Sequence, residues 1–197
     1  MELVIDVGNS ETVLGIVDPG TLDLREHWRL STPIPRTPDE YGLLLRSLLH
    51  DRGISHDDLT MAVLGSVVPS ATRILTDTLK QIVGEAPIVV DARSPLPIRL
   101  DVDEPLTVGA DRIVNTLAAK EMYGRDTIAV DLGTATTFDC ITADGVFVGG
   151  VIAQGLQSGL EWLGRKTAKL PRVELTPPTN VIGRRTEECI QSGVFFS

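Results

Sequence analysis

The chain has 197 residues and a formal net charge of −9 at pH 7, with a pI near 4.8. This balance argues against a nucleic-acid-binding face, which needs clustered Lys and Arg side chains to contact phosphates. No apolar run approaches membrane-spanning length, and Cys140 and Cys189 lack metal-ligand spacing. With 42% hydrophobic and only 4% aromatic residues, the composition is typical of an α/β enzyme. We therefore expect a cytoplasmic protein that binds neither nucleic acid nor membranes.

The first half of the sequence predicts an alternation of strands and helices. Short apolar runs predict buried strands, and leucines at helical spacing predict a helix after residue 37. Thr37, Pro38 and Glu40 have the pattern of a capping box with proline at the first helical position. Strands are expected at 3–5, 12–17, 27–30, 61–68 and 88–90, and helices from 37 to Gly53, at 70–83 and at 112–123, with residues 93–108 irregular.

The opening pattern of the chain recurs in its second half. Asp131 lies 125 residues after Asp6, and each begins an Asp-x-Gly turn between two short apolar runs. An internal duplication predicts two similar subdomains that face one another across a cleft. We place the boundary after Gly124, which divides the chain into residues 1–124 and 125–197.

The turn at Asp6 has the composition of a phosphate-binding hairpin. Gly8 would let backbone N–H groups approach a phosphate, and Asp6 at the strand end could hold Mg²⁺. Asp, Gly and Asn are also common in ordinary hairpin turns, which would explain a single copy. The second copy adds hydroxyls at Thr134, Thr136 and Thr137. The pair favours two turns that hold nucleotide phosphates from opposite sides.

Two further segments are ambiguous from the residues alone. Asp111 would lie at the start of a helix, where it can serve as an N-cap or as a catalytic base. The neighbouring Arg112 could bind a substrate carboxylate with two hydrogen bonds. Gly149 and Gly150, expected at the end of a strand, together with Gly155, would permit close approach of the backbone to a ligand or to a packed element.

Taken together, these segments resemble the type III pantothenate kinase family of the acetate/sugar-kinase, Hsp70 and actin superfamily. The order and spacing of the matching segments agree with the family from the first residues to the last. The segments are 6–10, 36–41, 66–69, 109–112, 131–137, 149–150, 167–171, 182–186 and 190–193.

The resemblance implies an α/β fold of duplicated ribonuclease-H-like (actin-like ATPase) subdomains with a cleft between them. It implies transfer of a phosphoryl group from ATP to pantothenate, the first step of coenzyme A biosynthesis. ATP with Mg²⁺, a monovalent cation (K⁺ or NH₄⁺) and a homodimer are implied as well. Two alternatives remain: a non-catalytic relative that acts as a transcription accessory factor, and a kinase for another small hydroxyl compound.

The resemblance also implies roles for individual residues. Asp111 is the expected general base, Asp131 the K⁺ ligand and Asp6 the Mg²⁺ ligand. Thr186 is expected to contact pantothenate from the partner subunit of a dimer. The expected ATP-binding residues are Asp6, Val7, Gly8, Asn9, Ser10, Glu11, Thr12, Val13 and Thr134, and the expected pantothenate-binding residues are Gly109, Ala110, Asp111, Arg112 and Thr186.

The sequence departs from the family pattern at several positions. Ser10 replaces the usual Thr, Gln154 stands where Pro is common, and Leu100 lies near a position that is often aromatic. Family chains also continue past the residue that matches Ser197, with a segment that contacts adenosine. We therefore expect an incomplete second subdomain, with weaker ATP binding and exposed apolar surface.

Overall fold

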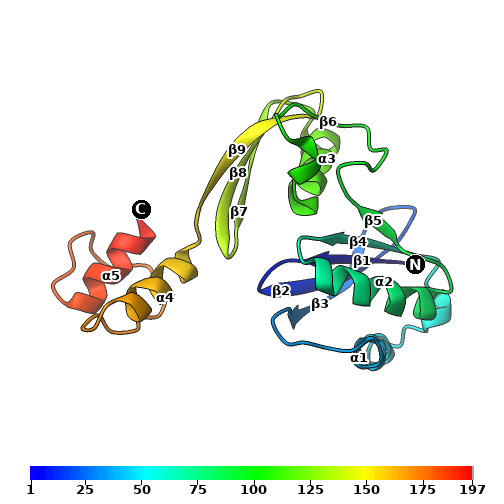
Figure 1. Cartoon of the computed structure of the whole chain (residues 1–197), viewed down its shortest axis with the longest axis horizontal. Coiled ribbons are helices and arrows are strands. Elements are labelled where there is room, and N and C mark those ends of the chain that lie inside the picture. Colours follow the sequence, from blue (N-terminus) through cyan, green and yellow to red (C-terminus); the bar gives the residue numbers. More distant parts are fainter. Residues whose placement is uncertain (197) are drawn as a thin grey trace.

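A computed structural model, in which residues 1–196 are described, places a five-stranded sheet in the N-terminal part of the chain (Figure 1). The strand order is β3-β2-β1-β4-β5, with β1 antiparallel to β2 and parallel to β4. The strands are β1 (Glu2–Val7), β2 (Glu11–Val17), β3 (Leu24–Ser31), β4 (Met61–Ser66) and β5 (Ile88–Val90). The elements that accompany them are α1 (Pro38–Asp51), α2 (Pro69–Val83) and a 3₁₀ turn at His56–Asp58.

Alternation along the strands separates the two faces of this sheet. Leu3, Ile5 and Val7 of β1 are buried and belong to one apolar core with side chains of α1 and α2. The residues between them, Val4 and Asp6, point to the opposite face, because successive strand side chains alternate. That opposite face forms one wall of a cleft. The alternating apolar residues of β1 thus face the core, and the residues between them face the cleft.

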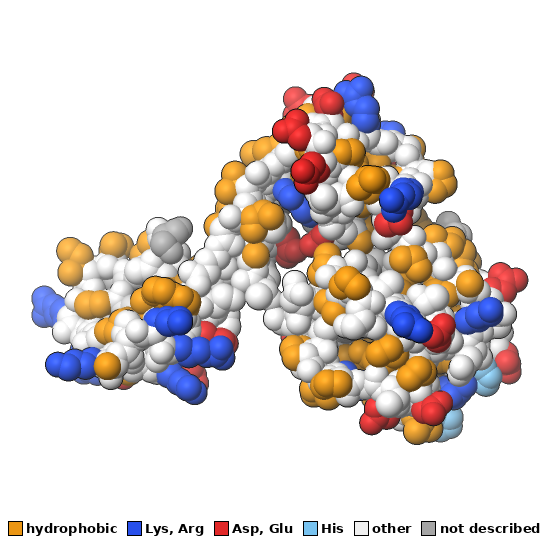
Figure 2. Space-filling model, viewed as in Figure 1, with side chains coloured by type: hydrophobic (Ala, Val, Ile, Leu, Met, Phe, Trp, Pro, Cys, Tyr) orange, Lys and Arg blue, Asp and Glu red, His pale blue; other side chains and the backbone are white. Residues whose placement is uncertain are grey.

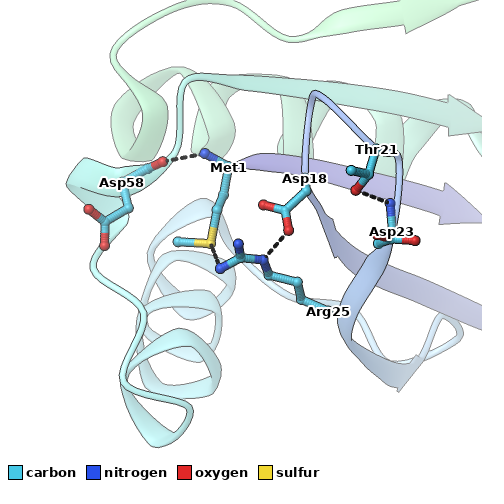
Figure 3. A network of polar contacts seen from close by, with 6 residues as sticks. All are labelled: Met1, Asp18, Thr21, Asp23, Arg25 and Asp58. Atoms are coloured by element: carbon cyan, nitrogen blue, oxygen red, sulfur yellow. Dashed lines mark hydrogen bonds and ion pairs between the residues drawn. The ribbon is translucent and has the colours of Figure 1, made fainter.

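Polar contacts hold the start of β1, at the end of the sheet opposite the Asp6 turn (Figure 3). The N-terminal ammonium of Met1 donates a hydrogen bond to the carbonyl oxygen of Asp58 at 2.8 Å. Arg25 Nε lies 2.5 Å from Asp18 Oδ2, and its Nη1 lies 3.8 Å from the Met1 sulfur. These contacts, together with the strand ladder, fix the register of the strand that carries Asp6.

The second half contains a four-stranded sheet with the order β6-β9-β8-β7. Helix α3 packs against β7 and β8, and it also reaches β4 of the first sheet. Phe147 and Ile141 are buried against Ala119 of α3. The elements are β6 (Arg99–Leu100), a 3₁₀ turn at Pro105–Thr107, α3 (Ala110–Tyr123), β7 (Thr127–Leu132), β8 (Ala135–Ile141) and β9 (Val146–Gln154).

The last two helices form a small lobe of their own beyond the end of β9 (Figure 1). Helix α4 (Leu156–Lys166) packs on α5 (Thr186–Phe195) through the buried side chains of Leu160, Ile190 and Val194. Apolar side chains also remain exposed on the second sheet, including Ile128, Val130 and Leu132 of β7 and Val151 and Ile152 of β9.

The sequence placed most elements correctly. The capping box at Thr37 is confirmed in both of its hydrogen bonds, and Gly124 ends α3 with a left-handed φ of 55°. Two details were wrong. Residues 93–108 contain a short strand, and the Gly149-Gly150 pair lies in the middle of β9 rather than at its end.

The expected division after residue 124 stays a prediction. Both β6 and α3 precede that position, yet their side chains join the core of the second sheet.

The cap of α1 gives a test of local stability. Thr37→Ala removes the acceptor for the Glu40 N–H, so we expect the free energy of unfolding to fall by about 1 kcal/mol. Ser47→Ala, on an exposed position of the same helix, is the matched control and should change stability by less than about 0.5 kcal/mol. Urea denaturation of the two variants and the wild type measures both effects, and equal midpoints for all three would contradict this assignment.

Candidate active site

A cleft of about 790 Å³ lies between the open face of the first sheet, the start of α3 and strand β7. Its lining includes three carboxylates, Asp6 of β1, Asp111 of α3 and Asp131 of β7. Figure 2 shows acidic side chains in the notch between the part of the molecule that contains the first sheet and the part that contains α3 and the second sheet. The structure therefore brings together three of the carboxylates that the sequence singled out.

Both Asp-x-Gly turns connect two antiparallel strands, but the second turn is one residue shorter than the first. Asp6 pairs with Val13 across the first hairpin, and Asp131 pairs with Thr137 across the second. Gly8 N–H donates to the carbonyl of Glu11 at 2.9 Å, and Gly133 N–H donates to that of Ala135 at 3.0 Å. The repeat read from the sequence is thus present as two similar antiparallel hairpins.

A hydrogen bond joins these turns across the cleft. Ser10 Oγ and Thr134 Oγ1 lie 2.6 Å apart, although 124 residues separate them in the chain. Gly155 packs against the second turn so closely that a Cβ there would lie 2.5 Å from the Thr134 carbonyl oxygen. Ser158 Oγ donates to that same oxygen at 2.8 Å. The start of helix α4 therefore supports the second turn, which explains the glycine at its N-cap, Gly155.

Other residues of the first turn differ in accessibility. Val7 and Thr12 are buried, and the Thr12 hydroxyl bonds to that of Thr32 at 2.8 Å. Glu11 is exposed and pairs with Arg29 at 2.8 Å. The side chains of Val7 and Thr12 therefore support the turn from below, whereas those of Asn9 and Ser10 are exposed at its tip.

Asp111 lies in the first turn of α3, not at its N-cap, which is Gly109. The alternative interpretation of Asp111 as an N-cap was therefore wrong. Its Oδ1 accepts a hydrogen bond from the backbone N–H of Arg112 at 2.9 Å. A Cβ at position 109 would collide with that oxygen, so Gly109 makes room for the carboxylate. Asp111 is thereby folded back on the helix start and borders the cleft.

Arg112 already has a partner, which the sequence analysis did not foresee. Its Nε donates to Asp139 Oδ1 at 2.6 Å, and Asp139 is fully buried in β8. Arg112 is therefore held by a protein carboxylate rather than standing as an isolated cation. An aspartate inside an apolar strand is unusual, and this was the signal that could have drawn attention to Asp139.

Thr186 is not part of this cleft. It is the first residue of α5 and is exposed in the α4–α5 lobe, which Figure 1 shows apart from β1 and α3. Within residues 1–196, no group of three His, Cys, Asp or Glu side chains is arranged to hold a metal ion. No helix in the same part of the chain is long and apolar enough to cross a membrane.

The three carboxylates also determine the electrostatics of the cleft. Burial raises the pKa of Asp6 above its ordinary value of 3.8, and the charges of Asp111 and Asp131 raise it further. The side chain remains accessible from the cleft, so the walls remove only part of its hydration. The cleft consequently favours a bound cation near Asp6.

Comparison with known proteins agrees with this geometry. The description of the type III pantothenate kinase family matches residues 2–197. The chain belongs to this family. Type III pantothenate kinases of Moorella thermoacetica and Streptomyces coelicolor are 44% and 42% identical to it. The alignments cover 100% of this chain and 76% and 75% of the two relatives. Membership in the type III pantothenate kinase family makes this chain a kinase.

Solved structures support the fold class. A Campylobacter jejuni protein described as a Baf family transcriptional activator aligns with a TM-score of 0.57 at 18% identity, over 98% of this chain and 74% of that one. A Sinorhizobium meliloti chain described as a 2-dehydro-3-deoxygalactonokinase aligns with a TM-score of 0.51 at 13% identity, over 85% and 58%. At these identities the likeness concerns the fold alone, which is the ribonuclease-H-like class expected from the sequence.

The raised pKa of Asp6 predicts a pH-dependent stability. An acid whose folded-state pKa is raised destabilises the folded protein as pH rises from the ordinary value through the raised one. Asp6→Asn removes the titrating carboxyl group and with it this loss of stability at neutral pH. The variant should therefore melt at a higher temperature than the wild type at pH 7. The difference should vanish below about pH 3.8.

Thermal melts of both proteins across this pH range provide the measurement. Asp103→Asn, which alters an exposed loop carboxylate outside the cleft, should leave the melting temperature unchanged at every pH. A wild type that is at least as stable as Asp6→Asn at pH 7 would contradict the electrostatic description of the cleft.

Proposed function

We propose that this chain transfers the γ-phosphoryl group of ATP to the primary hydroxyl of pantothenate and so forms 4′-phosphopantothenate for coenzyme A biosynthesis. The observation that carries the proposal is the meeting of two Asp-x-Gly turns and Asp111 around one cleft. Membership in the family agrees with it.

ATP phosphates are proposed to bind between the two turns. The turn of residues 8–11 presents backbone groups and the Ser10 hydroxyl, and Thr134 presents a second hydroxyl opposite. Small residues allow a phosphate to approach the backbone closely. The Ser10–Thr134 hydrogen bond supports this proposal, because it places the two turns close enough to contact the same phosphate chain. The proposed ATP contacts are the residues from Asp6 to Val13 and Thr134.

Cations are proposed to complete the phosphate site. Asp6 fits Mg²⁺, which in such sites takes one or two carboxylates and otherwise phosphate oxygens and waters. Asp131 on the facing hairpin fits a monovalent cation, K⁺ or NH₄⁺. The charge of Asp131 contributes to the raised pKa of Asp6, which shows that the two carboxylates repel each other. This repulsion supports the fit, because bound positive charge would relieve it. When bound, the cations neutralise charge on the transferring phosphoryl group.

Asp111 is proposed as the general base. One carboxylate oxygen accepts the Arg112 N–H, which fixes the orientation of the group and leaves its remaining acceptor capacity for the pantothenate hydroxyl. Gly109, Ala110 and Arg112 are proposed to hold pantothenate beside this base. Positioning of the hydroxyl in line with the γ-phosphoryl group would supply most of the rate.

Replacement of the base gives a direct test of this assignment. Asp111→Asn should keep the fold and the affinity for ATP but lower turnover by about 10²–10⁴-fold, because the hydroxyl proton loses its acceptor. Steady-state kinetics with ATP and pantothenate measure the effect, and calorimetric titration measures ATP binding. Asp103→Asn again serves as the carboxylate control, with wild-type turnover. Turnover of Asp111→Asn within a few-fold of the wild type would remove Asp111 from this role.

A homodimer is proposed to bring Thr186 to the site of a neighbouring subunit. In a single chain Thr186 lies in the α4–α5 lobe, outside the cleft. The exposed apolar residues of β7 and β9 offer surface for a two-fold contact. Light scattering at micromolar concentration should give twice the mass of the chain, and Thr186→Ala should raise the KM for pantothenate. A strict monomer with full activity would contradict the dimer.

A further inference from the structure

A buried ion pair ties the start of α3 to the second sheet. The Arg112 side chain is 17% exposed and that of Asp139 is 0% exposed. Nε of Arg112 donates to Asp139 Oδ1 at 2.6 Å, and Nη2 lies at the same distance from that oxygen without hydrogen-bond geometry. Asp139 Oδ2 and Arg112 Nη2 are both buried without a hydrogen-bond partner. The pair therefore has one buried donor and one buried acceptor that make no hydrogen bond.

Phe147 and Gly150 of β9 border the guanidinium of Arg112. The Phe147 ring of β9 lies beneath it, with the guanidinium carbon 4.8 Å from the ring centroid. Gly150 lies directly opposite Asp139 in the β8–β9 ladder. A Cβ on Gly150 would lie 2.6 Å from Nη2 and would also collide with the Phe138 carbonyl oxygen. Gly150 therefore leaves space for the guanidinium, which explains why a strand interior contains this glycine.

Stability alone gives little reason for this arrangement. The first turn of a helix carries a partial positive charge, so a cation such as Arg112 is unfavourable there. A buried ion pair is seldom more stable than an apolar pair of similar size. The same turn carries Asp111, whose Oδ1 accepts the Arg112 N–H. Arg112 thus lies next in the chain to Asp111, which lines the cleft.

We propose that Asp139 is a positioning residue that acts through Arg112. Its carboxylate orients the guanidinium towards the pantothenate site, and Gly150 provides the space in which this orientation exists. The inference rests on the proposed function, in which Arg112 binds pantothenate. Asp139 itself does not contact the substrate.

A double-mutant cycle of Arg112→Gln and Asp139→Asn tests this assignment. Arg112→Gln should raise the KM for pantothenate by about 10–100-fold, the range of a hydrogen bond to a charged group. Asp139→Asn should raise the same KM by about tenfold while leaving the KM for ATP unchanged. In the Arg112→Gln background, Asp139→Asn should cause no further change, because its only route to the substrate has been removed.

Thr78→Val serves as the stability control, because Thr78 is also fully buried and hydrogen-bonded but lies on α2, outside the cleft. It should lower the melting temperature without altering the KM for pantothenate. Gly150→Ala provides an independent arm if Asp139→Asn does not fold. It should displace the guanidinium and raise the KM for pantothenate in the wild type but not in Arg112→Gln.

The outcomes separate the inference from the proposed function. Additive effects of the two substitutions, or a wild-type KM for Asp139→Asn beside a raised KM for Arg112→Gln, would overturn the positioning role alone. A wild-type KM for Arg112→Gln would overturn the assignment of Arg112 to pantothenate and the positioning role with it. If only the Gly150→Ala arm can be measured, equal KM increases in both backgrounds would overturn the positioning role.

Discussion

Three carboxylates share one partly desolvated cleft, and the rest of the structure holds them there against their mutual repulsion. Asp6, Asp111 and Asp131 come from three separate elements, and the pKa of Asp6 records both the lost hydration and the neighbouring charges. Such a cluster is unfavourable for a protein without ligands. Bound cations would offset this repulsion, and the proposed phosphate transfer needs such positive charge beside the phosphates.

Rigid elements position each member of this cluster. Asp6 and Asp131 occupy equivalent places in two strand ladders, so their backbones cannot move independently of the sheets. Asp111 is fixed by its hydrogen bond to the helix start, and the Arg112–Asp139 pair ties that same turn to β8. The Ser10–Thr134 hydrogen bond joins the tips of the two hairpins. The departure of Ser10 from the usual Thr keeps the hydroxyl that makes this contact.

Glycines recur wherever two of these parts approach closely. Gly109 admits the Asp111 carboxylate, Gly150 admits the Arg112 guanidinium, and Gly155 admits the backbone of the second turn. In each case a single added Cβ would meet an atom of the site or of its support. These three glycines are therefore explained by close packing rather than by turn geometry.

The sequence by itself determined most of the elements and the duplication, because both depend on local patterns, but it missed the short strand β6 and helix α4. Alternating apolar residues defined β1, the capping box defined the start of α1, and the repeated Asp-x-Gly turn indicated two facing hairpins. Tertiary structure alone decided that Arg112 is paired, that Gly150 lies inside β9, and that Asp139 is buried beside them. The Arg112–Asp139 pair joins residues that are far apart in the chain, and so does the Ser10–Thr134 hydrogen bond. The spacing of apolar residues in the sequence does not specify which side chains come into contact when a helix packs on a sheet. Only the tertiary structure therefore shows these partners.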